Sequence, residues 1–130
     1  MALNLIEYLE KSAMKFPDKL AVSDEKTELT FSELRNYAMA AASYIIDATG
    51  AEKNPVAVEV DRCTQSVVMF LAVLYSGNFY VPIDNKMPED RVSLILSDIN
   101  PVLCLNIKEK NFFGGFNVKA AFYEKIKDYE

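Results

Sequence analysis

The chain has 130 residues, of which 51 % are hydrophobic and 25 % are charged, as in an ordinary soluble globular domain. Its 19 acidic residues outnumber its 14 basic residues and give a net charge of −5, which counts against a nucleic-acid binder that relies on phosphate contacts. The absence of histidine excludes Ser-His-Asp and Cys-His nucleophiles and His-ligated zinc, and with only 4 glycines no segment forms a glycine-rich phosphate loop.

The first part of the chain, residues 1–54, predicts a helix, a hairpin and a second helix. The first helix ends at Pro17, and its apolar residues recur at helical spacing: Leu5, Ile6, Leu9, Ala13 and Phe16. The strand-like segments 20–22 and 28–30 flank a polar turn and therefore predict a small hairpin.

The second helix carries its own start and stop signals. Thr30 and Glu33 have the spacing of a capping box, with Thr30 as the N-cap. Gly50 has the position of a glycine that ends a helix. The face expected to be buried comprises Phe31, Leu34, Ala38, Ala41, Ala42 and Ile45.

Residues 55–106 alternate between strand-like and helical patterns. The strands are expected at 56–60, 79–83 and 102–105, and the helices at 64–76 and 88–99. Right-handed crossovers make such strands parallel and place the helices over the sheet. The predicted fold class is therefore α/β, a three-layer βαβαβ parallel-sheet unit preceded by a helix, a short hairpin and a second helix.

Single residues mark the ends of these elements. Thr64 is expected to cap the nearly all-apolar helix that follows it, and Gly77 to end that helix. Pro82 is expected at the end of the second strand, because proline cannot donate a hydrogen bond inside a central ladder. Pro88 is expected in the first turn of the next helix.

The tail, residues 107–130, has a weaker pattern. Residues 112–116 form an aromatic segment broken by glycines, and residues 120–129 predict a weak charged helix. We find no sign of a second domain, so residues 1–130 are expected to form one unit.

Three carboxylates near strand ends are the candidates for acid–base chemistry or Mg²⁺ binding: Glu59, Asp61 and Asp84. Asp61 and Asp84 are better explained as caps of the turn or helix that follows each strand. Glu59 is expected to pair with a nearby cation. Asp61-Arg62 lies where α/β folds often bind ligands, and a ligand-binding role for this pair stays open.

Other features also favour structural roles. The turn 60–64 would bring bulky side chains to the place where a pyrophosphate needs bare backbone. The aromatic residues Tyr75, Phe79 and Tyr80 are expected in a core or a subdomain interface, because no basic residues are interleaved with them. We therefore expect no catalytic, cofactor-binding or metal-binding residue in this chain.

The cysteines and the chain start indicate the compartment. Cys63 and Cys104 are far apart and have no further partners, so they are expected to be buried, inert thiols in a reducing compartment. The chain start lacks the pattern of a secretory signal, and the longest apolar run, 67–75, is too short to span a membrane. A cytoplasmic protein without membrane contact is expected.

Two segments resemble core motifs of adenylate-forming enzymes. Residues 29–34, Leu-Thr-Phe-Ser-Glu-Leu, resemble the first motif, Leu-Thr-Tyr-x-Glu-Leu. Residues 71–84, which end in Tyr-Val-Pro-Ile-Asp, resemble the second, Leu-x-Ala-Gly-x-x-Tyr-Val-Pro-Ile-Asp. The resemblance covers residues 1–106 and implies a partial N-terminal subdomain of that fold.

The ending Tyr-Val-Pro-Ile-Asp is similar to that of amino-acid adenylation domains, as in nonribosomal peptide synthetases and D-alanine–carrier protein ligases. Departures from the pattern are Phe31 for tyrosine, Tyr75-Ser76 for a Lys-Ala pair, and Asn78 for a small or apolar residue. The choice between the two classes stays open, with a lean to the D-alanine ligases because the chain begins at the adenylation domain.

The resemblance implies that an amino acid is activated with ATP and Mg²⁺ to an aminoacyl-adenylate and then passed to a carrier-protein thiol. The family's nucleotide loop, specificity pocket and catalytic lysine lie C-terminal to this segment, so the chain alone is expected to be inactive and no site residue is carried over. A truncated sheet is also expected to self-associate. The alternatives are a stand-alone α/β binding or interaction module and a small flavodoxin-like or Rossmann-like ligand binder.

Overall fold

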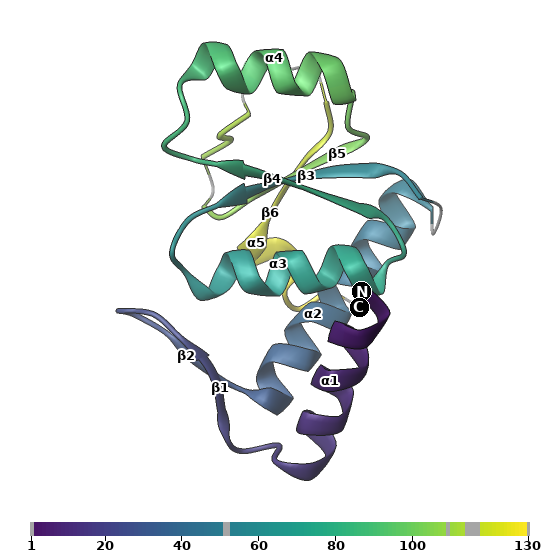
Figure 1. Cartoon of the computed structure of the whole chain (residues 1–130), viewed down its shortest axis with the longest axis vertical. Coiled ribbons are helices and arrows are strands. Elements are labelled where there is room, and N and C mark those ends of the chain that lie inside the picture. Colours follow the sequence, from purple (N-terminus) through teal and green to yellow (C-terminus); the bar gives the residue numbers. More distant parts are fainter. Residues whose placement is uncertain (1, 51–52, 109, 114–117, 130) are drawn as a thin grey trace.

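The computed structural model describes residues 2–50, 53–108, 110–113 and 118–129 (Figure 1). The elements are, in chain order, α1 (Ala2–Lys15), β1 (Leu20–Ser23), β2 (Glu28–Thr30), α2 (Phe31–Thr49), β3 (Pro55–Val60), α3 (Thr64–Tyr75), β4 (Phe79–Asp84), α4 (Glu89–Ile99), β5 (Leu103–Asn106), β6 (Ala120–Phe122) and α5 (Tyr123–Ile126). Up to β5 this order matches the predicted helix, hairpin, helix and βαβαβ unit.

The main sheet has four parallel strands in the order β4-β3-β5-β6. In the central strand β3, Val56 lies opposite Tyr80 of β4 on one side and opposite Leu103 of β5 on the other. The hairpin β1–β2 forms a separate antiparallel pair. The predicted parallel α/β unit is therefore confirmed.

The tail differs from the expected weak helix over residues 120–129. Its first part is the strand β6, in which Ala121 lies opposite Leu105 of β5 and is 4 % exposed. Its helical part, α5, covers only Tyr123–Ile126. The helix prediction was wrong for β6 because pairing with a distant strand outweighs weak local propensity. Of the glycine-broken segment 112–116, residues 114–116 lie outside the described residues.

The helices cover both faces of the sheet, as predicted for three layers (Figure 1). Helix α4 lies on one face, and α3 lies on the other, with α2 and α1 beyond it. Alternate residues of β3 point to opposite faces: Val56 and Val58 belong to the core shared with α2 and α3, and Ala57 to the core shared with α4. The α4 core comprises Ala57, Ile83, Val92, Leu96, Cys104 and Phe113.

The position of α3 in these layers explains why its sequence is almost entirely apolar. The sheet covers it on one side, and α1 and α2 cover it on the other, so Val68, Met69 and Val73 are fully buried. Ala38 and Ala41 of α2 are equally buried in this core, and their small side chains permit close helix packing. Among the described residues, no helix, including α3, is both long and apolar enough to cross a membrane.

The ends of α2 follow the sequence signals. The Glu33 amide donates to the Thr30 hydroxyl over 3.1 Å, and the Thr30 amide donates to the Glu33 carboxylate over 2.9 Å, so the predicted capping box is confirmed. Gly50, at φ +84°, ends the helix and donates its N–H to the carbonyl of Ile46.

Pro82 was expected at the end of its strand, but the structure places it inside β4. The amides of Phe79 and Asn85 donate to carbonyls of the β3 segment, so by alternation the backbone nitrogen of Pro82 faces away from β3. Within the described part of the chain β4 is an edge strand, and a proline there removes no ladder hydrogen bond. The missing donor also makes this edge less able to pair with another strand.

Helix α1 is more exposed than its apolar stripe predicted. Leu9 is buried, whereas Leu5 is 41 % exposed and Phe16, just beyond the helix, is 53 % exposed. A polar contact helps to attach α1, because the Tyr75 hydroxyl of α3 donates to the Glu10 carboxylate over 3.1 Å.

The three aromatic residues expected in one core or interface lie in different surroundings. Tyr75 and Tyr80 are half-buried, and the Tyr80 ring packs edge-to-face on Phe70 with centroids 4.4 Å apart. Phe79 is 55 % exposed on the edge strand β4. Phe79 therefore does not belong to a core, because its alternate position on the strand places it outside both cores, and its place in a subdomain interface stays a prediction.

Candidate functional site

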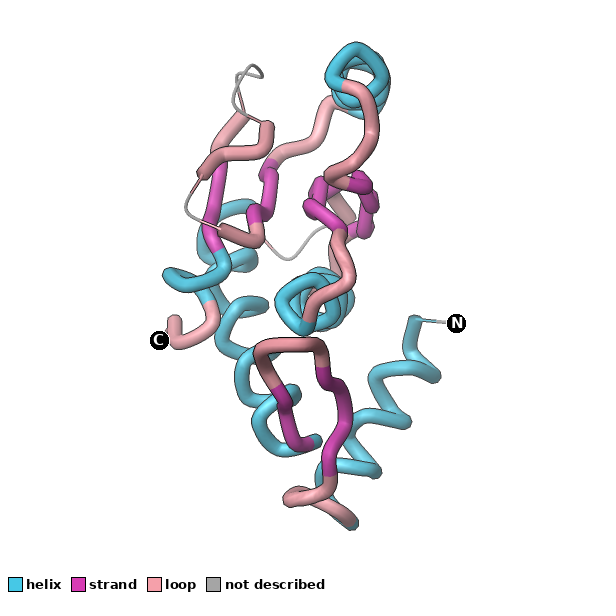
Figure 2. Tube along the Cα trace, turned by 90° about the vertical axis from the view of Figure 1, so that its left-hand side faces the viewer, coloured by secondary structure: helices cyan, strands magenta, loops and turns pink. Residues whose placement is uncertain are grey.

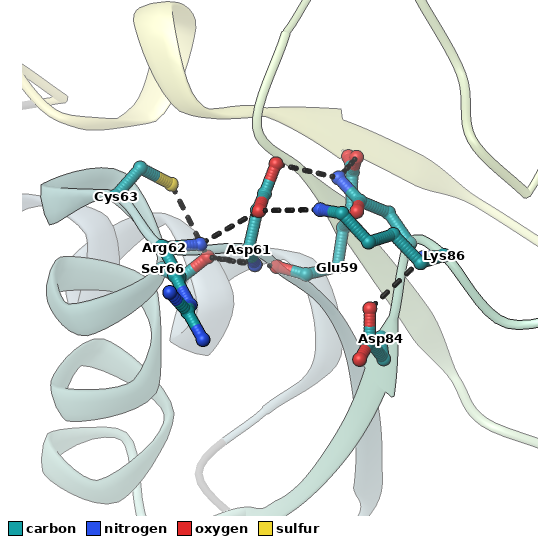
Figure 3. A network of polar contacts seen from close by, with 8 residues as sticks. Glu59, Asp61, Arg62, Cys63, Ser66, Asp84 and Lys86 are labelled. Atoms are coloured by element: carbon teal, nitrogen blue, oxygen red, sulfur yellow. Dashed lines mark hydrogen bonds and ion pairs between the residues drawn. The ribbon is translucent and has the colours of Figure 1, made fainter.

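The strongest concentration of polar side chains lies at the carboxyl ends of the parallel strands (Figure 3). Glu59 and Asp61 lie at the end of β3, and Asp84 and Lys86 at the end of β4. Parallel strands place these ends at one edge of the sheet, which is where α/β proteins bind ligands. The sequence candidates Glu59, Asp61 and Asp84 are therefore brought together at one edge.

The strand order creates a crevice at this edge. From β3 the chain passes through α3 to β4 on one side, whereas β5, reached through α4, lies on the other side of β3. The chain that leaves β3 turns toward β4, and the chain that leaves β5 turns the other way, toward β6, so the connections diverge at the ends of β3 and β5. This topological switch point is the position of the ligand in open α/β sheets.

Glu59 fills the switch point. One carboxylate oxygen accepts the N–H of Ile107, just beyond β5, over 2.9 Å, and the other accepts the side-chain amide of Asn85 over 2.9 Å. Glu59 is 8 % exposed. Within the described part of the chain the expected pairing with a cation is wrong, because two neutral donors, the amide just beyond β5 and the Asn85 side chain in the β4–α4 loop, reach this carboxylate instead.

Asp61 and Asp84 act as turn caps, as expected. Asp61 accepts the N–H of Arg62 over 2.8 Å and the ammonium of Lys86 over 3.0 Å. The Arg62 amide, followed by Lys86 and Asn85, lowers the pKa of Asp61 to about 2. Asp84 accepts the N–H of Lys86 over 2.9 Å and closes the turn after β4.

The N-terminus of α3 is capped from a distant part of the chain. The expected cap, Thr64, is the first residue of the helix, and its hydroxyl has no hydrogen-bond partner among the described residues. The Thr64 amide donates instead to the carboxylate of Asp24 in the β1–β2 turn, over 2.7 Å. Asp24 also accepts the N–H groups of Lys26 and Thr27, each over 2.8 Å. Figure 2 shows the hairpin turn reaching α3.

The Asp24 cap affects which ligands the N-terminus of α3 can bind. In nucleotide-binding α/β units, the N–H groups at this position hold a phosphate. Here a carboxylate of the chain occupies that position, and its interaction with the Thr64 amide is the first cause that lowers the pKa of Asp24. The first helix N-terminus after β3 is therefore not free to hold a phosphate.

Ser66 ties the first turn of α3 to the strand before it. Its hydroxyl donates to the carbonyl of Glu59 over 3.1 Å and accepts the N–H of Asp61 over 3.2 Å (Figure 3). The backbone at the end of β3 is therefore held from two sides, by Ser66 and by β5.

Two pockets flank the switch point. The first has a volume of about 530 Å³ and lies between α4 and residues 108 and 110–113, with Glu59 in its lining. The second has a volume of about 810 Å³ and lies between the hairpin turn and the start of α3. Lys108 lines both. The second pocket contains Asp61 and Arg62, so the structure places this sequence candidate at a cavity.

The two cysteines differ in burial. Cys104 is buried, and burial raises the pKa of its thiol to about 12, as expected for an inert cysteine. Cys63 is only partly buried, which differs from the expected full burial, and its sulfur lies 3.5 Å from the Ser66 hydroxyl. The described residues contain no group of three or more Asp, Glu, Cys or His side chains that could hold a metal ion.

Sequence reasoning missed three residues of this site: Asp24, Asn85 and Asn106. Asn106 is fully buried, donates to the carbonyl of Ala121 and accepts the N–H of Phe112 over 2.7 Å. Asp24 was recognised only as part of a polar turn, and nothing in the local sequence links it to α3. Each of the three acts through partners that are distant along the chain.

Comparison with known proteins identifies the family. A family model described as "AMP-binding enzyme" matches residues 9–121. Tyrocidine synthase 1 of Brevibacillus parabrevis is 32 % identical over 102 residues, which are 78 % of this chain and 9 % of that protein.

Two solved structures have the same fold. The N-terminal subdomain of Klebsiella oxytoca NpsA gives a TM-score of 0.78 at 18 % identity over 93 % of this chain and 32 % of that one. NpsA–ThdA, an artificially fused adenylation–PCP di-domain from the same organism, gives a TM-score of 0.78 at 17 % identity over 93 % of this chain and 23 % of that one.

The chain spans only 2–9 % of the length of the curated relatives that it matches. The family match, in contrast, covers most of the chain, and the two motifs at residues 29–34 and 71–84 lie inside it. This chain belongs to the AMP-binding enzyme family.

Proposed function

We propose that this chain is the N-terminal segment of an ATP-dependent ligase that activates an amino acid. The observation that carries the proposal is the family match over residues 9–121, together with relatives that are peptide synthases. In the complete enzyme the amino-acid carboxylate would displace pyrophosphate from ATP and form an aminoacyl-adenylate. A carrier-protein thiol would then displace AMP and leave an aminoacyl thioester.

The role of this segment in that reaction is structural. The N-terminus of α3, where nucleotide-binding α/β units hold a phosphate, is occupied by the Asp24 carboxylate, so the described residues do not fit the phosphates of ATP at this position. We therefore assign no catalytic step to any residue of this chain, and we propose that the chain alone is inactive. A carrier protein as partner is supported by the likeness to the adenylation–PCP fusion.

The proposed inactivity is tested with an amino-acid-dependent ATP–pyrophosphate exchange assay on the 130-residue chain. We expect no exchange above background with any of the standard amino acids or with D-alanine. Exchange that depends on one added amino acid would contradict the proposal.

The structural role of this segment within a ligase is tested with a chimera. Residues 9–121 replace the matching segment of tyrocidine synthase 1, and exchange is measured with the amino acid of that enzyme. We expect exchange to persist, because the segment supplies scaffold and not specificity. A folded chimera, judged by circular dichroism and thermal melting, that has lost exchange would contradict a purely structural role.

Self-association of the isolated chain is also proposed. Apolar side chains on α1 and at the start of the hairpin are exposed: Leu5, Tyr8, Met14, Phe16 and Leu20. Because Pro82 weakens the β4 edge, we expect association through these side chains. Size-exclusion chromatography with light scattering should give a dimer or larger species, and a single species of 14.7 kDa at high concentration would contradict this.

A further inference from the structure

Among the residues that the structure describes, the buried carboxylate of Glu59 has no cationic partner. The residue is 8 % exposed. In the part of the chain that the structure describes, the ion pairs involve the acids Glu10, Asp61 and Asp128, and not Glu59. Buried carboxylates in proteins are normally paired with a cation or bind a metal. Glu59 therefore lacks the compensation that its burial calls for.

The hydrogen bonds of Glu59 leave room for a further donor. Both of its oxygens accept N–H groups, from Ile107 and from Asn85, as an ionised carboxylate does. A carboxylate offers about four lone-pair sites, and the hydrogen bonds from described residues use two of them. Its neutral donors fix the side chain at the switch point without neutralising its charge.

A cavity lies beside this carboxylate. The pocket between α4 and residues 108 and 110–113 has a volume of about 530 Å³, and Glu59 forms part of its wall. Volumes of this size are typical of sites for small organic ligands. The apolar part of its lining comprises Met87, Val92, Leu96, Phe112 and Phe113. An apolar group would therefore find a matching surface within reach of a buried negative charge.

The charges at this pocket differ in their exposure. Glu59 is buried, whereas Glu89, Lys108 and Lys110 also line the pocket but are exposed. Water and salt screen exposed charges much more strongly than buried ones. The field inside the pocket is therefore dominated by the carboxylate of Glu59, which favours a cation.

We propose that this pocket binds a small organic ammonium compound with an apolar body. The ammonium group would donate hydrogen bonds to Glu59, and the apolar body would lie against α4 and the two phenylalanines. A bare metal ion fits less well, because the described residues offer no set of three ligands. The proposal concerns binding by this chain and does not depend on the activity proposed above.

The first test uses 2-phenylethylamine as the probe and follows the backbone amides of the whole chain by NMR. We expect saturable shifts at Ile107, Val92 and Leu96, with at most weak, non-saturating shifts elsewhere. The neutral analogue 2-phenylethanol and the anion 3-phenylpropionate should bind at least about ten-fold more weakly. Equal binding of the neutral analogue, or no saturable shift with the amine, would overturn the proposal.

The second test compares two variants that each remove one negative charge. Glu59→Gln should weaken amine binding at least about ten-fold. Asp98→Asn changes an exposed residue of α4, the helix that forms one wall of the pocket, but Asp98 itself does not line the pocket. This variant should leave binding unchanged. Equal loss in both variants would show a general charge effect and overturn the proposal. If Glu59→Gln does not fold, the comparison of the three probes on the unchanged chain decides.

Discussion

The two helices that pack together on one face of the sheet, α2 and α3, begin in different ways. The cap of α2 is local, because Thr30 and Glu33 exchange hydrogen bonds within one turn. The cap of α3 comes from Asp24, 40 residues earlier in the chain. The N-cap residue of α3 itself, Cys63, makes no side-chain capping bond.

One cap is formed by a short segment alone, whereas the other forms only when distant parts of the chain fold together. A local cap stabilises only its own helix. A distant cap also holds the hairpin against the core and places a negative charge at the end of α3. In this chain the distant cap takes the place that a phosphate holds in nucleotide-binding relatives of the fold class, so a structural contact also decides what this turn can bind.

The largest loss of stability is expected when the core that α2 and α3 share is disrupted. Met69 is fully buried in α3, so Met69→Ala should lower the free energy of unfolding by about 2–5 kcal/mol and weaken both caps. Met39→Ala, on an exposed position of α2, should cost much less. Denaturant unfolding of both variants provides the measurement, and equal losses would contradict the packing described for α3.

Removal of the distant cap should act on two regions at once. Asp24→Ala removes three hydrogen bonds, to the amides of Lys26, Thr27 and Thr64. Amide hydrogen exchange should become about ten-fold faster in the hairpin and in the first turn of α3. Glu25→Gln, in the same turn, is the matched control and should change neither region. Faster exchange confined to the hairpin would show that α3 does not depend on Asp24.

Removal of the local cap should have a smaller and more confined effect. Thr30→Ala should lower stability by about 1 kcal/mol, because one capping hydrogen bond is lost from an exposed helix start. Hydrogen exchange should rise in the first turn of α2 and stay unchanged in the first turn of α3. If exchange in the first turn of α3 rose as much as in Asp24→Ala, the cap of α2 would not be local, and the difference between the two caps would be contradicted.

Acid should weaken the distant cap in a defined window. The folded-state pKa values of Asp24 and Asp61 lie below the ordinary value of 3.8, that of Asp61 at about 2. Their contribution to stability is therefore present above pH 3.8 and is lost as the pH falls toward these lowered values. Thermal melts between pH 5 and pH 2 should show this loss, and Asp24→Asn should reduce its size. An unchanged pH profile in that variant would contradict an ionised cap.

The sequence predicted the elements whose signals are local. The capping box at Thr30, the alternating strand and helix patterns of residues 55–106, and the hairpin were all predicted, because propensity and periodicity act over a few residues. Pro82 was misplaced because its position depends on β4 being an edge strand, which only the strand order reveals.

The candidate site was harder to predict because its contacts are long-range. Glu59 was recognised, but its partners were not, since Ile107 reaches it only through the pairing of β3 with β5. Nothing in the sequence near Asp24 indicates its hydrogen bond to Thr64. The sequence of β6 predicts a helix, and only its pairing with β5 shows that it is a strand. Sequence patterns specify the elements, and the packing of the elements decides which polar groups meet.

We propose that this segment acts as scaffold and that the Asp24 carboxylate blocks the position of a phosphate at the N-terminus of α3. An NMR titration of the unchanged chain with ATP and Mg²⁺, following the amides of Thr64, Gln65 and Ser66, tests both statements together. We expect no saturable shift of these amides. A saturable shift centred on them would contradict the proposal, because it would show that a phosphate can reach the end of α3 in the presence of the Asp24 carboxylate.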